Sequence, residues 1–209
     1  HRAVRVARLR QAGVLRTSPR SARWLSFTAE QAVTPPAVAF TWNARVRVAP
    51  LVHVNVRDAY ADGEGAGQVR LFSLLPLGGA RGGEAMNSGS LHRYLAEAVW
   101  YPTALWPSRG LRWSPLDASR ALATLTDRGT TVSLAFSFDE AGDVAGIHTP
   151  GRWGKFEDGY RQAPWEGHFR GYAERDGLRV PAEGEVGWYD AGRWECVFRG
   201  RLTDARYER

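Results

Sequence analysis

The chain alternates apolar and polar residues along most of its length, as β-strands with one buried and one solvated face do. In the clearest example, residues 39–48, the even-numbered side chains are all apolar: Phe40, Trp42, Ala44, Val46 and Val48. By this criterion about twelve strands are predicted. They cover residues 3–16, 24–34, 39–48, 51–60, 69–75, 111–116, 120–127, 130–138, 143–152, 165–175, 178–188 and 193–207. Short turn sequences between many of them favour antiparallel neighbours.

One segment, residues 88–107, has helical spacing instead. Its apolar stripe is formed by Leu91, Tyr94, Leu95 and Ala98. A serine at position 88 or 90 can cap the first turn, and Pro102 ends the helix after Trp100. The glycine-rich residues 78–89 are expected to be a flexible connection into this helix.

A large antiparallel sheet with one apolar face must curl or pair to bury that face. One helix is too little to cover it as a separate layer. We therefore predict a mainly β fold, a large curved antiparallel sheet or half-barrel, with the principal helix packed in its concave face. No stretch is typical of a linker, so residues 1–209 are expected to form a single domain.

The positive charge is concentrated at the N-terminal end. The formal net charge is +6, and residues 1–29 hold seven arginines and no acidic residue, so the remainder sums to about −1. Residues 1–23 are thus a basic N-terminal strand or arm. Without a recognisable nucleic-acid motif this argues against a nucleic-acid partner and favours an arginine-rich edge strand; an arm for a protein partner is the alternative.

Several kinds of chemistry lack their sequence signals. Cys196 is the single cysteine, which excludes an internal disulfide, and the five histidines have no metal-binding spacing, so we expect no metal and no cofactor. The glycines of residues 63–67 lack the spacing of a nucleotide-binding loop. No apolar run is long enough to cross a bilayer, and no signal peptide is present in the chain, which favours a cytoplasmic location.

The strand at 51–60 carries the best site candidate. Its register directs Asp58 and Tyr60 toward the apolar face, where a carboxylate needs a partner. Arg93 is the first choice, and it shares a helix face with Glu97. Two interpretations are open. Asp58 and Glu97 are a general acid and base oriented by Arg93, or the three residues are a structural network that fixes the helix on the sheet. A bulge that turns Asp58 outward is a further alternative.

Other residues complete the set of candidates. Glu166 is a third carboxylate, but its parity places it opposite Trp165. Seven aromatic residues fall beside the predicted concave face or the helix and are candidates for ligand binding, with ordinary core packing as the alternative. They are Trp42, Tyr60, Tyr94, Trp100, Trp106, Trp113 and Trp165.

A series of short motifs is familiar: FTWNARV at 40–46, APWEGHF at 163–169 and RYLAExxWxPxAL at 93–105. With them the chain resembles a bacterial family of unknown function that is common in actinobacteria. More remotely, the predicted architecture looks like the lipoprotein-carrier (LolA-like) half-barrel, which holds acyl chains. The resemblance implies a fold rather than an activity.

We therefore expect the protein to bind a hydrophobic small molecule or lipid chain in a pocket between the sheet and the helix. The alternative is an enzyme, a cyclase, isomerase or hydrolase, that acts on an apolar substrate through Asp58 and Glu97. A third possibility is an interaction module that uses residues 1–23.

Overall fold

The computed structural model describes residues 2–71, 75–156 and 159–209. Within these residues thirteen strands form one antiparallel sheet. They are β1 (Val6–Leu15), β2 (Leu25–Thr34), β3 (Ala39–Ala49), β4 (Val52–Ala61), β5 (Glu64–Leu71), β6 (Leu75–Arg81), β7 (Leu111–Pro115), β8 (Arg120–Asp127), β9 (Thr130–Phe138), β10 (Val144–Phe156), β11 (Gly159–Arg175), β12 (Leu178–Asp190) and β13 (Arg193–Glu208).

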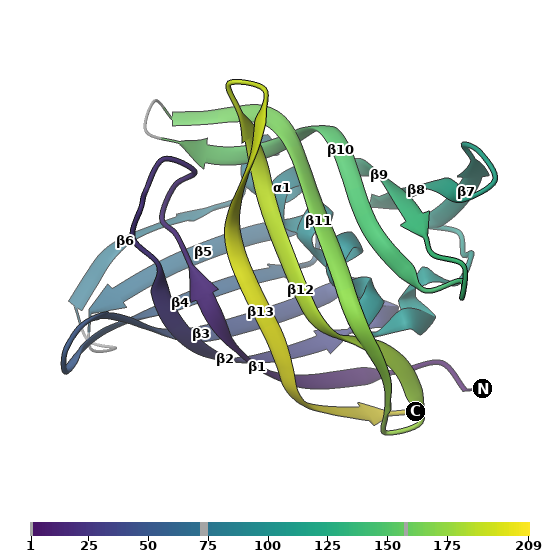
Figure 1. The fold of residues 1–209 in the computed structure, drawn as a ribbon, viewed down its shortest axis with the longest axis horizontal. Helices are drawn as coiled ribbons and strands as arrows, with labels where there is room; N and C mark the ends of the chain where they lie inside the picture. The colour runs from purple at the N-terminus through teal and green to yellow at the C-terminus, as the bar shows by residue number, and fades with distance from the viewer. Residues whose placement is uncertain (1, 72–74, 157–158) are drawn as a thin grey trace.

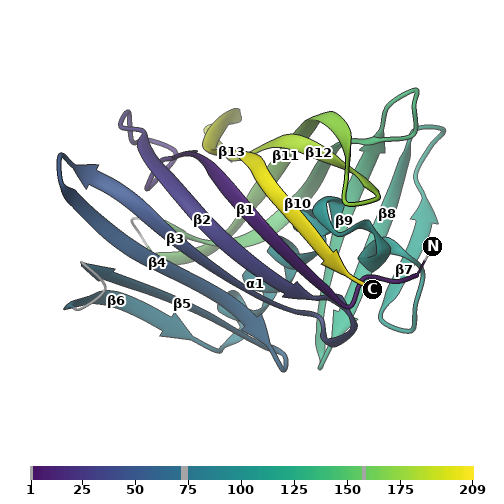
Figure 2. The same ribbon diagram turned by 90° about the horizontal axis from the view of Figure 1, so that it is seen from below.

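The sheet is built from two meanders joined at its centre. Its strand order is β6-β5-β4-β3-β2-β1-β13-β12-β11-β10-β9-β8-β7. The chain runs outward from β1 to the edge strand β6, crosses to the other edge, and returns from β7 to β13, which pairs with β1. Figures 1 and 2 show the sheet curling into a half-barrel. The predicted fold class is confirmed.

The helix α1 (Glu84–Glu97) makes the crossing and lies in the concave face (Figure 1). It contacts β4 and β5 on one arm of the sheet and β9 and β10 on the other. Two 3₁₀ turns, at residues 98–100 and 102–105, then lead to β7. The helix thus lies between the two arms of the half-barrel.

The helix begins earlier than the sequence pattern predicted. Its N-cap is Gly83, not a serine, and no side chain makes a capping hydrogen bond. The expectation of a flexible connection over residues 78–89 was wrong, because part of it is the edge strand β6 and part is the first turns of α1. Hydrogen bonds to β5 order the glycines of β6 despite their low strand propensity.

The strand predicted at 69–75 is instead the junction of β5 and β6, and residues 72–74 lie outside the described residues. Among the glycines of residues 63–67, Gly65 is required by packing against α1. A Cβ atom on Gly65 would lie 2.5 Å from the carbonyl oxygen of Met86 in α1. Glycine is needed there because the helix and the strand backbone approach each other closely.

The N-terminal strand lies at the centre of the sheet. β1 pairs with β2 on one side and β13 on the other, so the expectation of an arginine-rich edge strand was wrong. A β-bulge is present in β1, as a register shift between Arg10 and Gln11 opposite β13. Its arginines mark the solvated face of a central strand, and sequence alternation alone does not report which neighbours a strand has.

Candidate functional site

An inner polar network connects the helix to the sheet. From α1, Nη1 of Arg93 donates to Oδ2 of Asp58 on β4, and its Nε donates to Oε1 of Glu97, both at 2.7 Å. The strand register carries Asp58 to the inner face, as the sequence predicted, and Arg93 is its partner. The side chain of Asp58 remains 37% exposed, whereas those of Arg93 and Glu97 are 17% and 15% exposed.

The network continues across the floor of the half-barrel. Gln31 on β2 donates to Oε2 of Glu97 at 2.5 Å, and Gln11 on β1 donates to Gln31 at 3.1 Å. The indole of Trp42 on β3 in turn donates to Gln11 at 2.9 Å. Sequence analysis missed both glutamines, although their parity with buried apolar neighbours in β1 and β2 is a signal that could have identified them.

The charges in this network compensate one another. Burial alone would lower the pKa of Arg93, but Glu97 and Asp58 raise it above its ordinary value. The guanidinium also lies 4.7 Å from the ring centre of Trp42. Arg93 donates to both carboxylates, and this arrangement suits a network that fixes α1 on the sheet. Acid–base catalysis by Asp58 and Glu97 stays a prediction.

Five of the seven aromatic candidates are packed in the core. Their exposed fractions are 4% or less: Trp42, Tyr60, Tyr94, Trp100 and Trp165. The hydroxyl of Tyr60 donates to Asp127 at 2.8 Å, and that of Tyr94 donates to the carbonyl of Pro35. These rings belong to the buried core of the protein.

The remaining candidates lie elsewhere. Trp106 is 47% exposed, and Trp113 is half-buried with its ring 5.1 Å from that of Phe136. Glu166 on β11 accepts a hydrogen bond from the hydroxyl of Tyr189 and pairs with His168. It therefore belongs to the outer face, as its parity predicted, and does not join the inner polar network.

Two further titratable residues lie at α1: His92 is part of the helix, and Arg152 contacts it from β10. His92 is 5% exposed, its Nδ1 lies 3.0 Å from the carbonyl of Ser88, and burial lowers its pKa to about 4. Arg152 on β10 donates through Nη2 to the carbonyl of Gly89 at 3.0 Å. Sequence analysis did not single out Arg152; the Pro150–Gly151 pair within a strand was the available signal.

Beyond the helix the inner face is less covered. We call this part the uncovered inner face, and it is formed by partly buried apolar residues that pack against the core: Leu15, Val48, Val54, Val56, Phe156, Val186 and Phe198. They come from both arms and from the centre of the sheet. The surface is therefore mainly apolar, continuous with the core, and partly open to solvent; at its β10 end the guanidinium of Arg161 lies 3.8 Å from the ring centre of Phe156.

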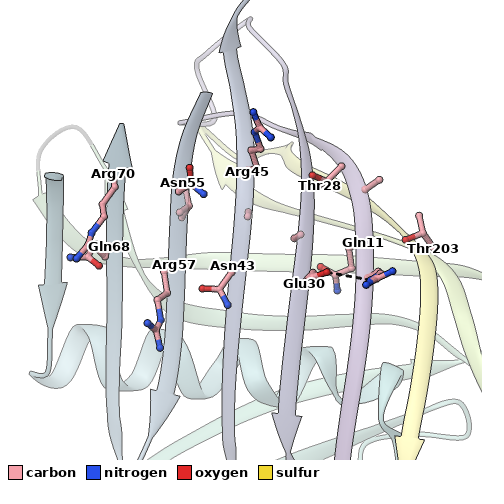
Figure 3. A pocket seen from close by; sticks show the side chains of 15 residues that line it. Gln11, Thr28, Glu30, Asn43, Arg45, Asn55, Arg57, Gln68, Arg70 and Thr203 are labelled. Carbon is pink, nitrogen blue, oxygen red and sulfur yellow. Dashed lines mark ion pairs between the residues drawn. The ribbon is translucent and has the colours of Figure 1, made fainter. Parts of the chain in front are cut away.

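A cavity of about 830 Å³ lies on the opposite, outer face of β1–β5 (Figure 3). Its side chains follow the strand register: Thr28, Arg45, Asn55 and Arg70 lie opposite one another on neighbouring strands. Eleven of the fifteen residues that line it are polar or charged. This lining does not match the apolar ligand that the sequence suggested.

In the part of the chain that the structure describes, no helix has both the length and the apolar character to cross a bilayer. No group of three or more histidine, cysteine, aspartate or glutamate side chains there is arranged to hold a metal ion.

Comparison with protein families shows which family this chain belongs to. The model of a family of unknown function, DUF6920, matches residues 1–207. The chain belongs to this family. Comparison with curated proteins found no significant match.

Two solved structures share the fold. A domain from Vibrio parahaemolyticus, whose name links it to outer membrane lipoprotein sorting, has a TM-score of 0.54 at 9% identity, over 97% of this chain and 85% of that chain. A LolA superfamily protein from Nitrosomonas europaea has a TM-score of 0.52 at 12% identity, over 98% of this chain and 86% of that chain. At these identities the likeness concerns the fold alone.

Proposed function

We propose that this member of the DUF6920 family binds a hydrophobic small molecule or the acyl chain of a lipid on the uncovered inner face. The observation that carries the proposal is a change in exposure along single strands. In β3, Val46 is 2% exposed, but the next inner-face valine, Val48, is only half-buried. In β4, Tyr60 is fully buried while Val54 and Val56 are half-buried. The inner face keeps its apolar character where α1 no longer covers it.

A ligand would complete this surface. Burial of apolar area is favourable by about 25 cal/mol per Å², so a flexible hydrocarbon that covers these side chains gains affinity without a precise fit. Val54 belongs to one arm of the sheet, Val186 to its centre and Phe156 to the other arm. A bound chain would therefore contact both arms of the half-barrel.

The names of the structural neighbours agree with this proposal by analogy, since one refers to lipoprotein sorting and the other to the LolA superfamily. The five buried aromatic candidates would support this binding surface from the core side. Contact of the ligand with any of them remains a prediction.

The test uses an uncharged fluorescent probe, N-phenyl-1-naphthylamine, whose emission rises in apolar sites. The wild-type protein is expected to bind it, and long-chain alkanols are expected to displace it. Val54→Asp places a charge on the uncovered inner face and should weaken binding at least about tenfold.

The matched control is the neighbouring substitution Asn55→Asp, which adds the same charge on the outer face of β4 and should leave the affinity unchanged. Thermal unfolding of both variants checks that they are folded. Equal affinities for the two variants would show that the probe does not bind on the inner face.

A further inference from the structure

A β-bulge turns Arg152 into the half-barrel. In β10, Thr149 pairs with Trp165 on the inner face, and strict alternation would then direct residue 152 outward. The register shift between Thr149 and Arg152 instead places Arg152 opposite Ala163, another buried inner-face residue. Bulges re-aim side chains in this way, often beside functional sites.

The guanidinium is held in a fixed position. Its Cζ lies 4.6 Å from the ring centre of Trp165 and 5.1 Å from that of Trp188, and Nη2 donates to Gly89 of α1. Contact with two tryptophan rings and a helix carbonyl leaves the side chain little freedom. Such pre-organisation lowers the entropy lost when a ligand binds.

No counter-ion in the part of the chain that the structure describes contacts the charge of Arg152 directly. Within the described residues Arg152 forms no ion pair, and its buried Nε atom has no hydrogen-bond partner. Burial, and secondarily the charge of Arg93, lower its pKa to about 10, so it remains protonated at neutral pH. The nearby carboxylates of Asp58 and Glu97 accept hydrogen bonds from Arg93 instead.

Arg152 also lies where the covered and uncovered parts of the inner face meet. Trp188, which it contacts, packs against Phe156 at 5.2 Å between ring centres. Phe156 belongs to the uncovered inner face, whereas Gly89 belongs to the helix. A hydrocarbon chain that lies along Phe156 would therefore bring its end close to this guanidinium.

We propose that Arg152 binds the head group of the ligand, and that the ligand is an amphiphile with a long apolar chain and a terminal carboxylate. This inference rests on the proposed function and names its ligand class. A guanidinium presents paired N–H donors that match a carboxylate. A partly buried arginine that has no counter-ion gains more from such a partner than an arginine that is already paired.

The test compares dodecanoate with 1-dodecanol, which has the same chain length and no charge, by displacement of N-phenyl-1-naphthylamine at pH 8. Wild-type protein should bind dodecanoate at least about tenfold more tightly. Arg152→Met removes the charged guanidinium but still places a long, unbranched side chain at this position. It should abolish the preference for dodecanoate, while the affinity for dodecanol changes less than about threefold. The control Arg57→Met, on the outer face of β4, should preserve the preference.

Arg152→Lys gives a second measurement should the methionine variant fail to fold. It keeps the charge but not the paired donors, so its preference for dodecanoate should fall between that of the wild type and that of Arg152→Met.

Dodecyl phosphate, tested on the wild type, distinguishes a carboxylate from a phosphate head group. Tighter binding of the phosphate would overturn the assignment to a carboxylate. Equal affinity for dodecanoate and dodecanol in the wild type, or a preference that survives in Arg152→Met, would overturn the role of Arg152 alone. Failure of both the probe and dodecanol to bind would overturn the proposed function together with it.

Discussion

Arg93 on α1 donates to Asp58 on β4 across 2.7 Å, so a charged contact ties the helix to one arm of the half-barrel. The same guanidinium holds Glu97, and Glu97 accepts a hydrogen bond from Gln31 on β2. Arg93 and Glu97 together thereby link α1 to two strands.

Removal of this guanidinium should destabilise the protein. Arg93→Met leaves the mostly buried carboxylate of Glu97 without its cationic partner, and we expect a loss of about 3 kcal/mol in the free energy of unfolding. Urea denaturation followed by circular dichroism measures it. Arg57→Met on the outer face of β4 should change the stability by less than about 0.5 kcal/mol. A stable Arg93→Met variant would show that the network does not fix the helix.

Asp58→Asn distinguishes a binding protein from an acid–base enzyme. If the network is structural and the ligand apolar, the affinity for an uncharged probe should stay within about tenfold of the wild type. If the protein turns over an apolar substrate through these carboxylates, Asp58→Asn and Glu97→Gln should each lower kcat by about 100-fold with folding intact. Unchanged turnover in both variants would remove the catalytic interpretation.

Gly65 should tolerate no side chain. Gly65→Ala places a methyl group 2.5 Å from the carbonyl oxygen of Met86 and the hydroxyl of Ser90, and we expect about 1–3 kcal/mol of destabilisation as α1 is displaced. Gly78→Ala, also in a strand, meets no atom within 4 Å and should be neutral or slightly stabilising. Thermal unfolding of the pair measures the difference. Similar melting temperatures would indicate that the helix can move away at little expense.

His92 should make the free energy of unfolding depend on pH. Its pKa is about 4 in the folded protein, lowered chiefly by burial, against an ordinary value near 6.5 in the unfolded chain. The unfolded chain therefore takes up the proton first. The contribution of this residue is complete above pH 6.5 and decreases as the pH falls toward 4, by about 3 kcal/mol in total.

The variant His92→Gln tests this dependence. Its unfolding free energy, measured between pH 7 and 4, should fall less steeply than that of the wild type. Parallel curves for the two proteins would show that His92 does not titrate abnormally in the folded state.

The sequence predicted what depends on local alternation. The parity of β3 and β4 correctly placed Trp42 in the core and Asp58 on the inner face beside Arg93. These successes share one cause, because the two-residue period of a strand decides which face a side chain occupies.

What the sequence did not reveal depends on register and pairing over long distances. Arg152 points inward only because a bulge shifts the alternation, and the glycines of β6 are ordered by hydrogen bonds to β5. The central position of β1 depends on β13, whose pairing no local pattern encodes. Deletion of residues 1–23 should therefore prevent folding rather than remove an independent arm.

The pairing of β1 with β13 also bears on how the protein is made. Val6 pairs with Glu208, so one hydrogen-bonding edge of β1 stays unsatisfied until the ribosome has produced nearly the whole sheet. Contacts between such distant parts of a chain form slowly, and an unpaired strand edge can associate with other nascent chains. Arg8 and Arg10, on the solvated face of β1, would repel a second copy of the same strand during that interval.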